Sequence, residues 1–415
     1  MISFERFTLE NGLRVLFHHD STTPIAVVNT LYDVGARDEN STKTGFAHLF
    51  EHLMFGGSVN IADFDKPLQK AGGESNAFTS NDITNYYDTI PSYNLETALW
   101  LESDRMLSLA FTEKSLEVQR QVVIEEFKQR YLNQPYGDVW LHLRPLAYKN
   151  HPYKWATIGK EIKHIEEANM QDVKHFFKKH YGPQNAILCV AGNFTSDYVY
   201  DQVHKWYGEI PSGKRYVREV EKEKPQEEYR ENTLEREVPA DAFYYAFKMS
   251  SRKQFDYYVT DLISDALGAS KSSVLVASLQ KEKRLVTEIA AYITGSLDEG
   301  LLVVSGKLES GVSFEQFDAE FWKEINLFKS TSIKEKTLNR LKIKNQTARS
   351  FQEQGLLNRA MNLCFFELLG DADGINKEKT AYKNVSPEEI TRVSNLVLER
   401  ENCSLLKIKS IKNAK

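Results

Sequence analysis

The chain has 415 residues, of which 41% are apolar and 27% are charged, and its formal net charge is −5. This length predicts two or three globular domains, and the composition excludes a disordered or collagen-like chain. The slightly acidic balance gives no overall basic footprint for nucleic acid, and no run approaches the ~20 apolar residues of a membrane helix. The N-terminus has no basic region followed by an apolar stretch, so we expect no signal peptide and no membrane or nucleic-acid partner.

The first half of the chain alternates strand-like and helix-like patterns, beginning around the turn pair Asn11-Gly12. In chain order we expect strands within 8–20 and 25–36, helices at about 45–55 and 62–71, an alternating segment over 75–90, long helices at about 93–108 and 113–132, and a strand over 186–194.

The second half repeats that order. We expect a strand over 242–249, helices at about 254–267 and 272–280, an alternating run over 288–297, a strand over 300–308, helices at about 314–328 and 333–349, and a last strand over 405–409. Helix pairs flanked by strands in both halves predict a duplicated α+β fold. It would consist of two homologous α/β sandwich domains, each a mixed or antiparallel sheet with helices packed on it. A chance likeness stays open, because strand–helix alternation is common.

A charged stretch over 215–237, which contains Pro225 and shows no apolar period, separates the two halves. We interpret it as a linker, and its acidic runs as solvated faces rather than a trap for basic peptides. The predicted domains are therefore 1–214, the linker 215–237 and 238–415.

The three cysteines, Cys189, Cys364 and Cys403, show no CxxC spacing. An odd and sparse set is typical neither of a disulfide framework nor of a cysteine metal site. We expect all three to be small core residues, which predicts a soluble, cytoplasmic protein.

The segment GFAHLFEHLMFG carries the strongest functional pattern. His48 and His52 are four residues apart, so on a helix both imidazoles lie on one face and can hold one zinc ion. Glu51 shares that face and can act as the general base for water that the metal activates. The order H-x-x-E-H is the inverse of the common zinc-protease motif. The alternative is a helix with two polar-face histidines and a surface glutamate, but the surrounding Leu and Phe residues favour a buried helix.

A catalytic zinc ion needs a third protein ligand, and the segment VVIEEF offers one. Glu126 lies three and four residues after Val123 and Val122, so it shares their apolar face. Glu125 has polar helical neighbours. The pattern therefore favours Glu126 over Glu125, although most glutamates with such spacing are surface residues.

Three segments, GFAHLFEHLMFGG, AGGESNAFTSNDITNYY and VQRQVVIEEF, together resemble the pitrilysin/insulinase family of zinc peptidases, which includes mitochondrial processing peptidases and bacterial relatives. The resemblance implies a clamshell-type assembly with a catalytic first domain and a homologous inactive second domain. It also implies that His48, His52 and Glu126 bind Zn²⁺ and that Glu51 is the general base. Family members carry a second-shell glutamate seven residues before the third ligand. Here that residue is Gln119, which cannot add negative charge and so predicts a somewhat lower metal affinity.

The resemblance also implies how a substrate would bind. The similar strand in the family is a sheet edge near the zinc, to which an unfolded peptide adds as a further strand. Asn76, Ala77 and Phe78 are therefore expected substrate contacts. By composition alone, this segment would be an ordinary buried strand.

Relatives place an arginine and, seven residues later, a tyrosine near the reaction's oxyanion. The similar positions here are Gln280 and Thr287. Arg284 and Lys283 could compensate, but neither is in register. This deficit resembles that of the zinc-bearing subunit of a family heterodimer, whose partner lacks the zinc motif but supplies both donors. The alternatives are a self-sufficient homodimer and a noncatalytic peptide-binding or scaffold protein.

Overall fold

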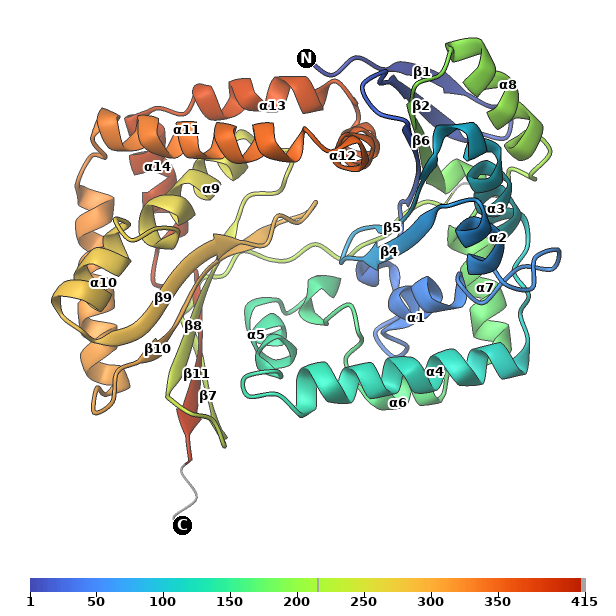
Figure 1. Cartoon of the computed structure of the whole chain (residues 1–415). Helices are drawn as coiled ribbons and strands as arrows, with labels where there is room; N and C mark the ends of the chain where they lie inside the picture. Colours follow the sequence, from blue (N-terminus) through green and yellow to red (C-terminus); the bar gives the residue numbers. More distant parts are fainter. Residues whose placement is uncertain (215, 412–415) are drawn as a thin grey trace. The chain divides into compact units, whose positions relative to one another are not determined.

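The computed structural model describes residues 1–214 and 216–411, and it divides into two compact units (Figure 1). The first unit contains Met1–Phe127, Trp155–Val220 and Arg349–Lys377. The second contains Lys128–Lys154, Glu221–Ala348 and Glu378–Lys415. Each unit therefore draws on both halves of the chain.

Among the described residues, the first unit has a six-stranded sheet with the order β1-β2-β6-β3-β5-β4. Its strands are β1 (Glu5–Thr8), β2 (Arg14–His19), β3 (Ile25–Tyr32), β4 (Glu74–Thr79), β5 (Thr84–Pro91) and β6 (Ala186–Gly192). Its helices are α1 (Phe46–Leu53), α2 (Asp65–Lys70), α3 (Leu95–Leu107), α4 (Glu113–Phe127), α6 (Ile162–Glu166), α7 (Met170–His180), α8 (Ser196–Tyr207) and α12 (Leu356–Leu369). Strand β4 forms one edge of this sheet and pairs with β5 alone.

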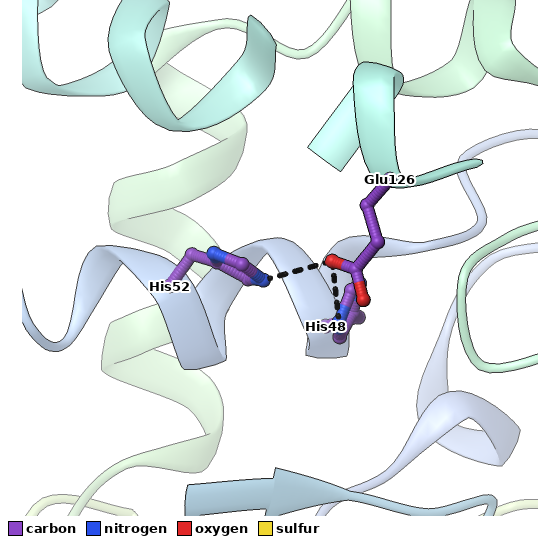
Figure 2. Close-up of side chains that lie close together, drawn as sticks. All are labelled: His48, His52 and Glu126. Carbon is purple, nitrogen blue, oxygen red and sulfur yellow. Dashed lines mark ion pairs between the residues drawn. The ribbon is translucent and has the colours of Figure 1, made fainter. Parts of the chain in front are cut away.

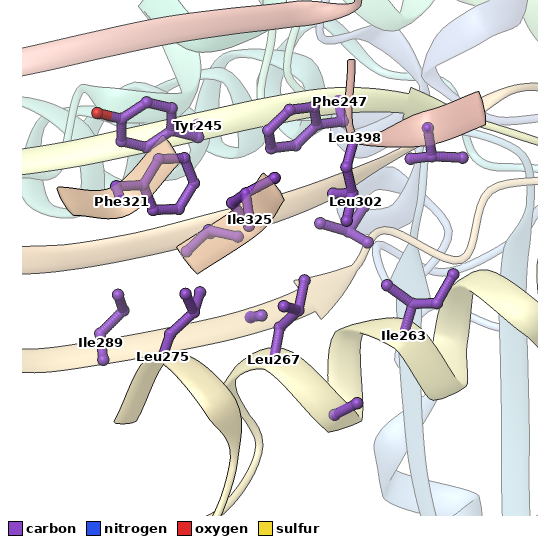
Figure 3. Packing of buried hydrophobic residues seen from close by; sticks show 14 of the residues in the cluster. Tyr245, Phe247, Ile263, Leu267, Leu275, Ile289, Leu302, Phe321, Ile325 and Leu398 are labelled. Atoms are coloured by element: carbon purple, nitrogen blue, oxygen red, sulfur yellow. The ribbon is translucent and has the colours of Figure 1, made fainter. Parts of the chain in front are cut away.

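The second unit has a five-stranded sheet, again counted over the described residues, with the order β7-β11-β8-β10-β9. Its strands are β7 (Arg230–Arg236), β8 (Ala242–Met249), β9 (Val286–Ile293), β10 (Gly300–Leu308) and β11 (Cys403–Ser410). Its helices are α5 (Val139–Ala147), α9 (Phe255–Gly268), α10 (Phe314–Ser330) and α14 (Pro387–Val397), while α11 (Glu335–Gln352) and α13 (Gly374–Lys383) cross the unit boundaries. Aromatic and aliphatic side chains of β8, β10, α9 and α10 pack together in its core (Figure 3).

The two sheets share one topology, which confirms the predicted α+β fold of two sheets with packed helices. In the first sheet β2 runs parallel to β6, and β6-β3-β5-β4 are antiparallel in turn. In the second, β7 runs parallel to β11, and β11-β8-β10-β9 are antiparallel in turn. Strand β1 is an addition at the edge of the first sheet.

A helix from the other half of the chain covers one face of each sheet. Helix α12 packs on β3 and β6, and α5 packs on β11 and β8. Strand β6 is buried along its whole length, so both of its faces need apolar cover. The exchanged helix α12 covers one of these faces.

Most of the predicted strands and helices are present, with two local corrections. The expected helix over 113–132 is α-helical only to Phe127, after which Lys128–Leu132 forms a π-helical turn. The expected short helix over 272–280 is a π-helical segment, Val276–Glu282. Among the described residues, no helix is long and apolar enough to cross a membrane.

Of the charged stretch over 215–237, residue 215 lies outside the described residues, and the remainder is not solvated throughout. It contains β7, which pairs with β11. The Glu223 side chain is only 3% exposed and accepts hydrogen bonds from the backbone N–H groups of Lys149, Asn150 and His151. This part of the chain is therefore anchored to the second unit. The domain boundaries drawn there stay a prediction.

Candidate metal centre

Helix α1 is preceded by a glycine that the backbone geometry requires. Gly45 has φ +87°, and a Cβ atom there would lie 2.6 Å from the Ile158 carbonyl oxygen. The buried Glu39 carboxylate accepts hydrogen bonds from the N–H groups of Gly45 and Ala47, at 2.9 and 2.8 Å. Burial raises the pKa of Glu39 to about 8, against the lowering effect of these two N–H groups. These contacts fix the start of the helix and its rotation about its axis.

One face of α1 is buried among aromatic rings. The Phe50 ring stacks on Tyr181 at 4.9 Å and contacts the Phe176 ring at 5.2 Å, and the Phe50 side chain is fully buried. The half-buried residues His48, Glu51 and His52 lie on another stripe of the same helix. The packing of Phe50 thus determines which way the three polar side chains point.

The two histidines converge on a carboxylate from α4 (Figure 2). The Glu126 Oε2 atom lies 3.6 Å from His48 Nε2 and 3.4 Å from His52 Nε2. One ligand-type atom from each of the three residues lies within 4.8 Å of the others. Their side chains are 12%, 24% and 17% exposed for His48, His52 and Glu126, so a small ion could reach them while most of each side chain stays buried.

Helix α4 presents Glu126 inward and Glu125 outward. Val123 and Phe127 are buried, Glu126 is half-buried and Glu125 is exposed. One premise of the sequence argument was wrong, because Val122 is 44% exposed and does not extend the apolar face. The buried face of α4 instead runs through Val123 and Phe127, one on each side of Glu126 in the sequence. Gln119 is half-buried, about two turns earlier on α4.

The expected substrate residues lie on the edge strand β4. The Asn76 and Phe78 side chains are exposed, whereas Ala77 is half-buried. The Ser80 N–H group donates to the Ile83 carbonyl, so the alternation of the antiparallel ladder turns the backbone groups of Ala77 away from β5. The Ala77 N–H group donates to the Asn76 side chain at 2.8 Å. A peptide that adds to this edge would therefore have to displace the Asn76 side chain to reach that N–H group.

Thr79 links this strand to α1, and sequence reasoning missed it. Its hydroxyl donates a hydrogen bond of 2.5 Å to the Glu51 Oε2 atom. The only signal was its place in SNAFTS, two residues after Ala77 and therefore on the same face of the strand.

Two family models match the chain. "Insulinase (Peptidase family M16)" matches residues 14–161, and "Peptidase M16 inactive domain" matches residues 167–345. The chain belongs to peptidase family M16. Among M16 relatives, zinc protease PqqE of Helicobacter pylori is 29% identical over 397 residues, which are 94% of this chain and 89% of that protein. Mitochondrial-processing peptidase subunit beta of Saccharomyces cerevisiae is 25% identical over 405 residues, 92% of this chain and 83% of that one.

Solved structures agree with the M16 assignment. A protease from Helicobacter pylori has a TM-score of 0.92 at 28% identity, and the match covers 99% of this chain and 100% of that one. Pitrilysin has a TM-score of 0.77 at 16% identity, and covers 100% of this chain and 45% of that one. This second likeness shows the fold alone.

The second half of this M16 chain differs from the family pattern where oxyanion donors are expected. The Gln280 side-chain amide donates to the Thr287 carbonyl at 2.7 Å. The Lys283 ammonium lies 2.6 Å from a carboxylate oxygen of Glu320 and 2.6 Å from one of Glu324. Lys283 is therefore engaged within its own unit. Arg284 is exposed and has φ +52°.

Proposed function

We propose that this chain is a zinc-dependent metalloendopeptidase subunit that cleaves unfolded peptides or small proteins. His48, His52 and Glu126 would hold the zinc ion, and Glu51 would act as the general base. The observation that carries the proposal is the convergence of two imidazole nitrogens and one carboxylate oxygen within 4.8 Å, with Glu51 on the same stripe of α1.

The donor set fits zinc. Zinc bonds of about 2.0–2.2 Å at tetrahedral angles set neighbouring ligand atoms roughly 3.3–3.6 Å apart. The two distances from Glu126 Oε2 to the histidines, 3.6 and 3.4 Å, have this size. Two histidines and one carboxylate are also the ligand types of many catalytic zinc sites, which keep one position open. Gln119 would support the site as a neutral second-shell residue.

Each residue then has a separate task. When bound, zinc supplies Lewis acidity, which polarises the peptide carbonyl and makes water more acidic. Glu51 takes the proton of the attacking water and later passes it to the leaving amine. Thr79 holds one oxygen of that carboxylate from the neighbouring strand. Asn76, Ala77 and Phe78 bind the peptide, mainly through backbone hydrogen bonds that demand little of its sequence.

We propose further that a homologous subunit completes the site. Gln280 and Thr287 stand where relatives carry arginine and tyrosine, and Lys283 is occupied by two carboxylates. One relative is itself named as a subunit of a processing peptidase. A self-sufficient homodimer would instead require a donor such as Arg284. The clamshell-type assembly and the cytoplasmic location remain predictions.

A noncatalytic peptide-binding protein is the alternative from another class, and the match to a domain named inactive keeps it open. The complete set of His48, Glu51, His52 and Glu126 favours catalysis, because peptide binding alone needs no base beside a metal site.

The variant Glu51→Gln distinguishes a catalytic protein from one that only binds peptides. An amide cannot accept the proton, so cleavage should fall by roughly 100–10,000-fold while zinc stays bound. The assay incubates zinc-loaded chain in excess over an unstructured fluorogenic peptide and detects cleavage by mass spectrometry, with zinc content measured in parallel. Cleavage by the Glu51→Gln variant at the wild-type rate would refute the role of Glu51. If the wild-type chain shows no zinc-dependent cleavage, either alone or with a homologous partner, the result would favour the noncatalytic protein.

A further inference from the structure

Two cysteines from opposite halves of the chain meet in the core of the first unit. Cys189 lies on β6 and Cys364 on the exchanged helix α12, and both are fully buried. They belong to one apolar cluster, in which β2, β3 and β6 pack against α12. The sequence pattern had predicted only three separate core residues.

The helix approaches this sheet very closely at Cys364. The Cys364 Sγ atom lies 3.6 Å from the Ile187 carbonyl oxygen on β6 and 3.8 Å from the Asn29 carbonyl oxygen on β3. A cysteine side chain extends only one atom beyond Cβ. Contact of that atom with the main chain of two strands therefore places the helix close to the sheet at this point.

The Cys189 side chain faces the same spot. Cys189 is directly opposite Asn29 in the β3–β6 ladder and two residues after Ile187, so its side chain is on the same sheet face as that of Ile187. The same cluster contains Ala191, two residues after Cys189 on β6, and Ala360, four residues before Cys364 on α12, beside larger residues such as Ile187 and Leu363. A disulfide requires Cα atoms about 4.4–6.8 Å apart, which is an unusually close approach for a helix on a sheet. The contacts of the Cys364 Sγ atom with two main-chain carbonyl groups indicate such an approach here.

We propose that Cys189 and Cys364 form a site of oxidative modification, at which the two thiols join as a disulfide that ties α12 to β6. The oxidant would be a small-molecule disulfide such as oxidised glutathione. One cysteine thiolate displaces a glutathione thiolate to form a mixed disulfide, and the second cysteine displaces the other. Two protein thiols thereby lose two electrons and two protons, and one glutathione disulfide becomes two thiols.

The reaction is slow in the folded chain. Contact with the Cys364 thiol, and then burial, raise the pKa of the Cys189 thiol well above its usual range. Its thiolate, the reactive form, is therefore scarce until α12 opens locally or the chain refolds. Once formed, the bond closes a loop that spans both halves of the chain. It should raise the midpoint of thermal unfolding, because it restricts the unfolded chain most when the loop is long.

The test exposes the full chain to oxidised glutathione in two ways, as native protein and during refolding from urea. Free thiols are counted in denaturant, and non-reducing peptide maps locate any link. We expect the count to fall from three to one, a peptide pair joining Cys189 to Cys364, and a higher unfolding midpoint that a reductant reverses.

Three variants serve as controls. Cys403→Ala keeps both members of the pair and should reach zero free thiols. Cys189→Ala and Cys364→Ala each remove one member, so neither should form the link or gain stability on oxidation. Retention of all three thiols after both treatments, or a link through Cys403, would overturn the proposal.

Discussion

At the scale of single residues, the candidate base Glu51 is hydrogen-bonded by a residue that belongs to another element. Glu51 lies on α1, and the Thr79 hydroxyl that binds its Oε2 atom lies on the edge strand β4. A hydrogen bond from a neutral hydroxyl to a carboxylate contributes about 1.5–3 kcal/mol and restricts the rotamers of the acid. The strand proposed to bind peptide therefore also orients the residue proposed to move the proton.

Thr79→Val tests this arrangement. Valine has nearly the same shape but cannot donate, so we expect zinc content and KM to stay near the wild type while kcat falls roughly tenfold. Steady-state peptide cleavage gives both constants. Thr79→Ser is the matched control, because it restores the hydroxyl and should recover most of the kcat. A Thr79→Val enzyme with an unchanged kcat would contradict the positioning role.

The site was only partly open to prediction from sequence. The spacing alone predicts that His48, Glu51 and His52 share one face of a helix, whereas their roles came from the motif and the family resemblance and stay a prediction. The choice of Glu126 over Glu125 rested on an apolar helix face through Val122 and Val123, but Val122 is exposed and only Val123 is buried. Thr79 was missed because its contact joins a strand to a helix, and no spacing rule describes such a pair.

At the scale of elements, a buried carboxylate anchors the segment that precedes β7. Glu223 accepts hydrogen bonds from three consecutive backbone N–H groups and lies 2.7 Å from the Lys248 ammonium. Burial alone would raise the pKa of Glu223. The hydrogen bonds from Lys248 and the backbone outweigh this effect and lower the pKa to about 2. The carboxylate therefore stabilises the folded chain at pH values above about 4.5, its ordinary pKa, and this stabilisation is lost as the pH falls towards about 2.

Glu223→Gln should reduce the free energy of unfolding by about 3 kcal/mol at pH 7, because it leaves the buried Lys248 without its counter-charge. The difference from the wild type should shrink as the pH falls below about 4.5. Urea unfolding at several pH values measures both effects. Glu227→Gln, an exposed change in the same stretch, should unfold like the wild type. Equal midpoints for Glu223→Gln and the wild type at pH 7 would contradict the anchoring role.

Element prediction succeeded for continuous apolar runs, but it omitted several helices, among them α7 and α8, which have local capping signals. The strands over 242–249 and 300–308 match β8 and β10, because continuous apolar runs mark buried strands. Helices α5 and α12 were not predicted. Each covers a sheet formed mainly by the other half of the chain, and no local pattern records such an exchange.

At the scale of the whole molecule, the two units have the same sheet topology but carry different candidate functional residues. The first unit carries the candidate metal centre, and the second lacks the expected arginine and tyrosine at Gln280 and Thr287. The loss of one oxyanion donor commonly costs about 2.7–4 kcal/mol of transition-state stabilisation. A zinc-loaded chain with neither donor should therefore be a weak peptidase by itself.

Mixing experiments test this dependence. We expect the purified chain to cleave an unstructured peptide poorly, and a homologous subunit that carries both donors but no zinc motif to restore cleavage in a 1:1 complex. Peptide hydrolysis and mass by size-exclusion chromatography are measured for each protein alone and for the mixture. Full activity from this chain alone as a homodimer would contradict the heterodimer and point to Arg284 as a donor.

The metal centre is the central claim, and zinc content in a pair of neighbouring glutamate variants tests it most directly. Glu126 meets both histidines, whereas Glu125 is exposed on the same helix. Elemental analysis of zinc-saturated, desalted protein should find one zinc ion per chain in the wild type and in Glu125→Gln, and far less in Glu126→Gln. Full zinc in Glu126→Gln, or none in the wild type, would contradict the account.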